Sequence, residues 1–172
     1  KVARRAFSST GRASHVPYMR QKDYVYFQQF IENDGYDLRV IVVENMVFGY
    51  YRKVLVNDFR ASGMNEVEKR ELPPEAMRIA LKAYGVFRMP MLVVDMLRDS
   101  DGKFWVIEMS PNCQIETPEQ LHVNGVPGAY MFSEDGSCRF EPGRFWVHEL
   151  ALRSFFKNYI RERLPATKAE GS

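Results

Sequence analysis

Two short β-rich runs joined by an Asp-Gly pair constrain the fold of this chain more than any other stretch. The runs are Met91–Arg98 and Phe104–Pro111, and Asp101-Gly102 between them is a strong signal for a tight β-hairpin. A two-residue loop at Asp101-Gly102 predicts that Arg98 faces Trp105 and that Asp95 faces Glu108. Side chains directly opposite on an antiparallel pair lie about 5 Å apart at Cβ.

The Asp95–Glu108 pair therefore places two carboxylates together among apolar neighbours. Without a partner they would repel, and their desolvation would cost several kcal/mol or force one to protonate. A hard cation between them removes this cost, and Mg²⁺ favours one or two carboxylates together with substrate phosphates. The first hypothesis is a magnesium–nucleotide site. In the alternative interpretation Asp95 pairs with a nearby arginine or caps a strand, and Glu108 lies on a solvated face; the apolar residues before both argue for interior positions.

Composition limits the class of protein. The 172 residues are 45% hydrophobic and 27% charged with a net charge of +2, which fits a folded domain and is too weakly basic to indicate nucleic acid. No apolar run approaches the roughly 20 residues of a membrane span, and no signal peptide is evident. Cys113 and Cys138 form neither a zinc pattern nor a disulfide framework, so a cytoplasmic setting is expected.

A second hairpin is predicted before the first. Strands are expected over Tyr24–Ile31, Asp37–Val43 and Met46–Val54, with a turn at Glu44-Asn45 or Asn45-Met46. Either two-residue turn puts Arg39 and Arg52 on one face, where two guanidiniums would bind anions such as a triphosphate. Asp37 could pair with one of them, and a three-residue loop would separate the arginines.

Helices are expected from Pro73 to Gly85 and from about Arg144 to Arg163, where His148 is interpreted as structural. The long irregular span after Pro111 should lie over the proposed site. Near the start of the chain, a Gly/Ser segment with Ser9, Gly11 and Arg12 could cradle phosphate or be a flexible surface loop.

A series of short segments follows in order along the chain: Gln28–Ile31, Asp37–Val40, Tyr51-Arg52, Asp58–Arg60, Asp95 and Ile107-Glu108. The order of these segments resembles the C-terminal part of an ATP-grasp domain. It is most similar to the carboxylate–amine ligases that include ribosomal-protein glutamate ligases and glutathione synthetases. The resemblance implies an α+β lobe with a mainly antiparallel sheet and helices packed on one side. Residues 1–164 would be this domain portion, without its N-terminal substrate domain, and 165–172 a disordered tail.

The resemblance also implies roles for individual residues. Catalytic arginines that contact phosphates or the acyl substrate would be Arg39, Arg52 and Arg60. ATP would be held by Ser9, Gly11 and Arg12 in a flap, and by Gln29, Phe30, Ile31 and Glu32 at the adenosine; Lys1 could match a family lysine before the flap. Magnesium ligands would be Asp95, Glu108, Ser110 and Asn112. The family usually has Asn where this chain has Ser110, and Asn112 follows two positions later.

The implied function is an ATP- and Mg²⁺-dependent carboxylate–amine ligase that works through an acyl-phosphate. Its partners would be a small-molecule or peptide carboxylate and an amine acceptor, with no nucleic acid or membrane and with a possible homo-oligomer. The absence of an evident Ser/His/Asp or Cys/His arrangement fits a reaction that needs no protein nucleophile. A phosphotransferase with the same ATP site, and a non-catalytic nucleotide-binding or assembly domain, remain alternatives.

Overall fold

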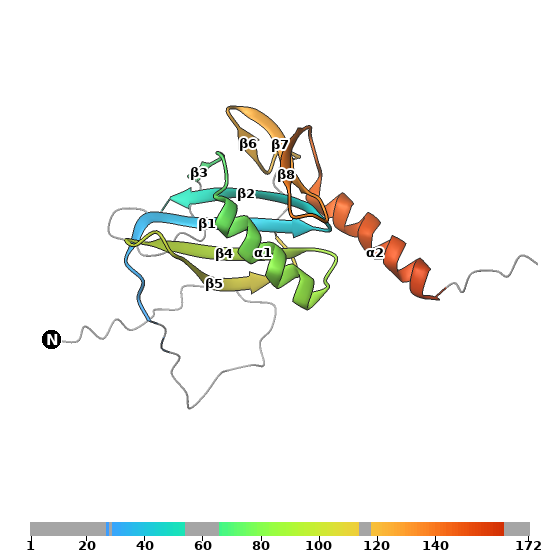
Figure 1. Ribbon diagram of the computed structural model, residues 1–172, viewed down its shortest axis with the longest axis horizontal. Helices are drawn as coiled ribbons and strands as arrows, with labels where there is room; N and C mark the ends of the chain where they lie inside the picture. Colours follow the sequence, from blue (N-terminus) through green and yellow to red (C-terminus); the bar gives the residue numbers. More distant parts are fainter. Residues whose placement is uncertain (1–26, 28, 54–65, 114–117, 164–172) are drawn as a thin grey trace, which may run out of the picture. The chain divides into compact units, whose positions relative to one another are not determined.

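The computed structural model describes residues 27, 29–53, 66–113 and 118–163 (Figure 1). The chain divides into two compact units, residues 1–30 and 31–172, and the strands and helices described below all belong to the second. The expected strand over Tyr24–Ile31 is not found at residues 27 and 29–31, and its other residues lie outside the described ranges, as does the tail 165–172. Neither helix in the described part of the chain has the length and apolarity needed to cross a lipid bilayer.

The described residues form an antiparallel sheet and two helices, as the α+β prediction requires. The strands are β1 (Asn33–Val43), β2 (Met46–Lys53), β3 (Val67–Glu68), β4 (Leu92–Asp99), β5 (Phe104–Ser110), β6 (His122–Val123), β7 (Val126–Phe132) and β8 (Cys138–Pro142). They are ordered β5-β4-β1-β2-β7-β6, with β3 on β2 and β8 on β7. The helices are α1 (Pro74–Phe87) and α2 (Val147–Arg163). The prediction of a mainly antiparallel sheet is confirmed.

The loop of the β1–β2 hairpin has two residues and not the three of the longer loop considered from the sequence. Val43 pairs with Met46, so Glu44 and Asn45 form the turn, and Glu44 has a positive φ of 53°. In this register Asp37 pairs with Arg52. Because side chains alternate along a strand, Arg39 lies on the same face as Arg52, as predicted.

The β4–β5 hairpin differs from the prediction at its tip. Arg98 pairs with Phe104 instead of Trp105, and Gly102, with a φ of 83°, donates its N–H to the carbonyl of Asp99 at 3.0 Å. The loop is therefore one residue longer than the two-residue loop predicted. A bulge between Asp95 and Met96 then shifts the register by one, and Asp95 does face Glu108. The pairing is confirmed, although the register used to derive it was wrong at the tip.

The two helices cover opposite faces of the sheet, which corrects the expectation that helices pack on one side. The face with Leu38, Val40 and Val42 packs against Ala76, Met77 and Ala80 of α1. The alternate residues Ile41 and Val43 pack against Val147 and Ala151 of α2. Strands that are apolar on both faces need cover on both. Figure 1 shows α1 across the sheet and α2 beyond its end.

The helix ends also differ from their predicted positions. α1 continues through Gly85 to Phe87 and ends at Arg88, which has a left-handed φ of 50° and donates its N–H to the carbonyl of Tyr84 at 2.9 Å. The helix end expected at Gly85 therefore lies at Arg88, and the left-handed residue that closes the helix is an arginine instead of a glycine. α2 begins at Val147, three positions after the expected Arg144.

Candidate nucleotide and metal site

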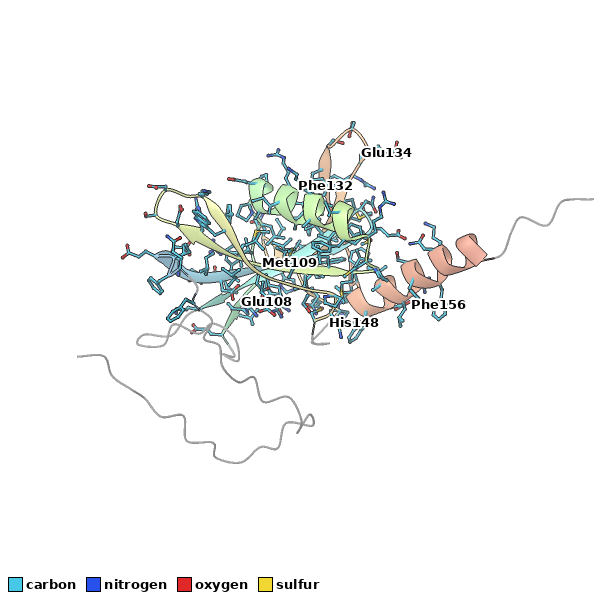
Figure 2. The ribbon with its side chains drawn as sticks, turned by 90° about the horizontal axis from the view of Figure 1, so that it is seen from below. Glu108, Met109, Phe132, Glu134, His148 and Phe156 are labelled. Carbon is cyan, nitrogen blue, oxygen red and sulfur yellow. The ribbon has the colours of Figure 1, made fainter. Side chains whose placement is uncertain are left out.

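Five charged side chains from four neighbouring strands share the face that α2 partly covers. They are Asp37 and Arg39 of β1, Arg52 of β2, Asp95 of β4 and Glu108 of β5. Pairing of Asp37 with Arg52, of Arg39 with Asp95 and of Asp95 with Glu108 fixes this common face. Figure 2 shows Glu108 on the side of the sheet away from α1.

Asp95 and Arg39 form a bidentate ion pair. Arg39 donates from Nε to Oδ1 and from Nη2 to Oδ2 of Asp95, both at 2.8 Å. This fork-to-carboxylate geometry is among the stronger charge-assisted hydrogen bonds in proteins. The Asp95 side of the pair is buried, whereas Arg39 keeps 18% of its side chain exposed.

Arg52 is shared by two carboxylates. Its Nη2 donates to Oδ2 of Asp95 at 2.7 Å and also to Oδ2 of Asp37. All three residues are at least 90% buried, so the attraction is weakly screened. The four groups Asp37, Arg52, Asp95 and Arg39 thus alternate in charge across three strands and sum to zero. The sequence-based expectation that Asp37 pairs with an arginine is confirmed.

The two buried aspartates have pKa values that move in opposite directions. Burial is the main cause that raises the pKa of Asp37 to about 6, and Arg52 only partly offsets it. Burial also opposes ionisation of Asp95, but the hydrogen bond from Arg39 and the charge of Arg52 outweigh it and lower the pKa of Asp95. The difference follows from the pairing, because among the described residues Asp95 has two arginine partners and Asp37 has one, Arg52, which it shares with Asp95.

Two polar atoms of this network are buried without a hydrogen-bond partner among the described residues: Oδ1 of Asp37 and Nε of Arg52. A buried polar atom without a partner costs about 1–3 kcal/mol. The Asp37–Arg52 pair is therefore capable of one more hydrogen bond than it makes.

Glu108 differs from Asp95 in its surroundings. It is exposed on β5, which ends the described strand order, and the described residues offer its carboxylate no hydrogen bond or ion pair. The expectation of an interior position is thus correct for Asp95 and wrong for Glu108. Both features of the alternative interpretation, an arginine partner for Asp95 and a solvated Glu108, are present in the structure.

The other two predicted metal ligands have protein partners. Ser110 donates its hydroxyl to the carbonyl of Asn112 at 2.8 Å. The side-chain oxygen of Asn112 lies 3.2 Å from Nε2 of His148, which is 2.8 Å from the carbonyl of Cys113. His148, labelled at the start of α2 in Figure 2, therefore ties the segment after β5 to the helix, a role consistent with the structural interpretation. The role of Ser110 and Asn112 as metal ligands stays a prediction.

The donor set fits a hard cation of the magnesium type. Asp95 and Glu108 supply two carboxylates on adjacent strands, and Mg²⁺ completes its shell with water and phosphate oxygens. No cluster of three or more His, Cys, Asp or Glu side chains suited to a metal occurs among the described residues, so a closed all-protein site is not present there. Any cation at Asp95 would compete with the arginines that now hold both of its oxygens.

Several predicted site residues lie elsewhere. Ser9, Gly11, Arg12 and Arg60 fall outside the described residues, as does Lys1. Gln29 and Phe30 are exposed and belong to the first unit, whereas Ile31 and Glu32 lead directly into β1. Their proposed contacts with ATP stay predictions.

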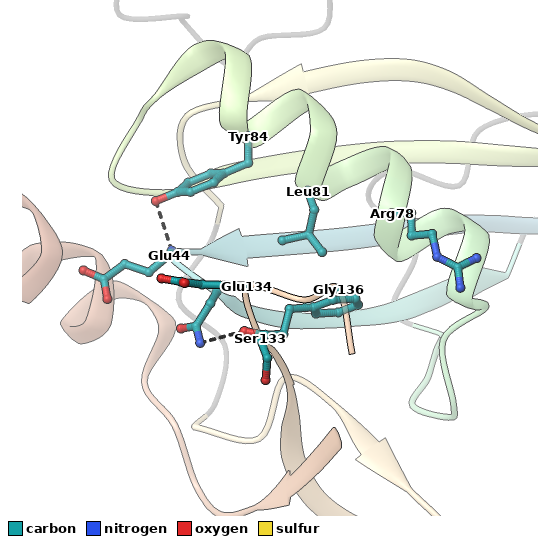
Figure 3. Close-up of a pocket in the computed structure, with 9 residues that line it drawn as sticks. Glu44, Arg78, Leu81, Tyr84, Ser133, Glu134 and Gly136 are labelled. Carbon is teal, nitrogen blue, oxygen red and sulfur yellow. Dashed lines mark hydrogen bonds between the residues drawn. The ribbon is translucent and has the colours of Figure 1, made fainter. Parts of the chain in front are cut away.

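A large hollow lies away from these charged groups. It has a volume of about 790 Å³ and runs between α1 and the turns joining β1 to β2 and β7 to β8. Figure 3 shows it lined by Arg78, Leu81, Tyr84, Glu44, Ser133, Glu134 and Gly136, with the hydroxyl of Tyr84 accepting the N–H of Glu44 at 3.0 Å. Because α1 covers the face opposite Asp95, this groove does not belong to the candidate site.

Comparison with known proteins decides the family. Residues 13–126, about two thirds of the chain, match the RimK-like ATP-grasp domain. The chain belongs to this family. A curated relative, coenzyme gamma-F420-2:alpha-L-glutamate ligase of Methanocaldococcus jannaschii, is 39% identical over 87 residues. That alignment covers 49% of this chain and 30% of the relative, so the RimK-like chain spans less than a third of that enzyme's length.

Solved structures give a weaker likeness. The macrocyclase MdnB of Microcystis aeruginosa has a TM-score of 0.40 at 17% identity, covering 51% of this chain and 31% of its own. A RiPP-associated ATP-grasp ligase of Chryseobacterium gregarium, in complex with ADP and a leader and core peptide, has a TM-score of 0.43 at 22% identity, covering 49% and 27%. At these values the likeness bears on neither the substrate nor the site.

Proposed function

We propose that this RimK-like chain is the metal- and phosphate-binding portion of an ATP- and Mg²⁺-dependent carboxylate–amine ligase. The observation that carries the proposal is the pairing of Asp95 with Glu108 on the same sheet face as Arg39 and Arg52, in a chain of this family. A metal–triphosphate complex requires carboxylates that bind the cation and, beside them, guanidiniums that bind the phosphates.

The proposed reaction has two steps. An oxygen of the substrate carboxylate attacks the γ-phosphorus of ATP, ADP leaves, and an acyl-phosphate forms; an amine nitrogen then attacks the acyl carbon, phosphate leaves, and the amine loses a proton. Arg39 would contact the phosphate oxygens and stabilise their charge, while Asp95 and Glu108 hold the cation. Mg²⁺, when bound, would neutralise and align the phosphates. Ser9, Gly11, Arg12 and Arg60 remain proposed phosphate contacts.

The substrate class is proposed from the curated relative. Its name describes a ligase that uses L-glutamate. The corresponding reaction proposed here joins a small-molecule or peptide carboxylate to an amine, such as that of an amino acid. A cytoplasmic setting and a homo-oligomer stay predictions.

Trapping the acyl-phosphate tests the proposal. The full-length protein is incubated with ATP, Mg²⁺, a panel of carboxylates and hydroxylamine, and hydroxamate is measured. We expect hydroxamate with at least one carboxylate, and its loss in Glu108→Gln but not in Glu141→Gln, a control at a strand carboxylate of β8. Phosphorylation of a hydroxyl compound without hydroxamate would support the phosphotransferase. Nucleotide binding with neither product would support the non-catalytic alternative.

A further inference from the structure

The two arginines beside Asp95 are not equivalent in their other contacts. Arg52 has a second carboxylate, Asp37, on the neighbouring strand. Arg39 has Asp95 as its one carboxylate partner among the described residues, and its side chain is about twice as exposed as that of Arg52. A cation that takes over Asp95 would therefore affect the two guanidiniums differently.

The buried atoms without hydrogen-bond partners indicate that Arg52 can form a second hydrogen bond with Asp37. Nε of Arg52 and Oδ1 of Asp37 are both buried and both lack a hydrogen-bond partner among the described residues, although Nη2 already donates to Oδ2 of the same aspartate. A guanidinium that uses Nε and Nη2 on the two oxygens of one carboxylate makes the bidentate pair that Arg39 already makes with Asp95. A small rotation within the Asp37–Arg52 pair would satisfy both atoms.

We propose that Asp37 is a positioning residue that retains Arg52 when a divalent cation takes Asp95, so that Arg39 is the arginine released to the phosphates. This inference rests on the proposed function, because it needs a cation at Asp95. Without Asp37, Arg52 has no second carboxylate among the residues that the structure describes and stays on Asp95, where it competes with the cation. Arg52 then acts as a buried counter-ion and not as a substrate ligand, which revises the role that its position in the motif suggested.

Charge balance supports this division. With the cation at Asp95 and Glu108, the Asp37–Arg52 pair remains neutral and can stay buried, where an unpaired charge would cost several kcal/mol. Arg39 then lacks a carboxylate partner among the described residues and becomes a partly exposed cation on the same face, a state that an anion stabilises. The cation and the triphosphate should therefore bind together more tightly than either alone.

The test is a calorimetric titration of a non-hydrolysable ATP analogue into the full-length protein, with Mg²⁺ and with EDTA. Wild type is compared with Asp37→Asn, Arg52→Gln and the double variant, and with Asp101→Asn as an exposed carboxylate control. We expect Asp37→Asn to weaken Mg²⁺-dependent binding about tenfold or more, the scale of one strong charge partner, while binding in EDTA changes little. In the Arg52→Gln background, Asp37→Asn should have little further effect.

The outcomes separate the two proposals. Wild type that binds no analogue with Mg²⁺ overturns the proposed function and this inference together. Wild-type binding that Asp37→Asn leaves unchanged, or weakens equally in the Arg52→Gln background, overturns the inference alone.

A second measurement is made on wild-type protein and so does not depend on whether the Asp37 and Arg52 variants fold. In wild-type protein, NMR of arginine Nε–H groups, assigned with Arg39→Lys, should show the Arg52 signal becoming protected from exchange when Mg²⁺ and the analogue are added. Loss of protection at Arg52 would contradict retention by Asp37.

Discussion

At the level of single residues, the site is a row of charges whose partners decide their roles. Asp95 is buried and paired with Arg39 and Arg52, Asp37 is buried and shares Arg52 with Asp95, and Glu108 is exposed. The two aspartates have the same ordinary pKa, and the fold moves their pKa values in opposite directions. Their distinct surroundings give distinct pH and mutational behaviour.

Asp37 should make the protein less stable as the pH rises from about 4 to above 6. Its pKa is raised from 3.8 to about 6, so in this range the folded state holds a proton that the unfolded state has released. By linkage, the free energy of unfolding should fall by on the order of 2–3 kcal/mol across this window and then level off. The lowered pKa of Asp95 acts in the opposite direction and below pH 4, outside the window.

Urea unfolding of wild type and Asp37→Asn at pH 4, 5, 6 and 7 measures this effect. The stability of wild type relative to the variant should decline with pH, because the amide that replaces the carboxyl group in the variant does not titrate. A constant difference between the two proteins would contradict the raised pKa.

At the level of elements, the hairpin tips and helix ends are where sequence and structure diverge. The β-rich runs located β1, β2, β4 and β5. Both two-residue turns considered for the first hairpin, of which the structure has Glu44-Asn45, put Arg39 and Arg52 on one face, so this shared face followed from the sequence. The tip of the β4–β5 hairpin did not, because Asp99 accepts the N–H groups of Asp101 and Lys103 at 3.0 and 2.9 Å and stabilises a longer loop. A residue pattern indicates that a turn is present, but local hydrogen bonds of this kind determine how many residues the turn has.

Gly85→Ala should stabilise the protein by about 0.5–1 kcal/mol, because Gly85 lies inside α1 without a positive φ and an added Cβ there would meet nothing within 4 Å. Gly102→Ala is the contrasting change: its φ of 83° disfavours a side chain, so it should destabilise the β4–β5 hairpin. Thermal unfolding of both variants provides the comparison. Equal effects would contradict the different conformations of the two glycines.

Removing the imidazole of His148 tests whether α2 holds the segment after β5. His148→Ala should increase hydrogen exchange at residues 110–113, because the contacts at 3.2 and 2.8 Å from Nε2 are lost. Arg153→Ala, at an exposed position of the same helix, is the matched control and should leave this exchange unchanged. Unchanged exchange in His148→Ala would show that the segment is held by other contacts.

At the level of the whole molecule, the sequence was sufficient for the family, the antiparallel sheet and the face that carries the charges. It did not show that α2 covers the face opposite α1, since helix periodicity identifies an apolar side without naming the strands it meets. It offered an arginine partner for Asp95 and a solvated Glu108 only as an alternative interpretation, because the burial of one strand position depends on its neighbours in the sheet. The sequence did offer Asp37 as a partner for one of the two arginines, and the structure shows that this partner is Arg52.

Nucleotide binding at this face depends, in our proposal, on a cation held by Asp95 and Glu108. The decisive experiment is calorimetric titration of a non-hydrolysable ATP analogue into full-length wild type and Glu108→Gln, with and without Mg²⁺. Glu108 is exposed and makes no hydrogen bond or ion pair with the described residues through its carboxylate, so its replacement should leave the fold intact. We expect Mg²⁺-dependent binding in wild type that Glu108→Gln weakens at least tenfold, since the loss of even an outer-shell partner of a metal ligand costs about 10–100-fold in metal affinity. Equal binding by the two folded proteins, or binding that is indifferent to Mg²⁺, would contradict the proposal.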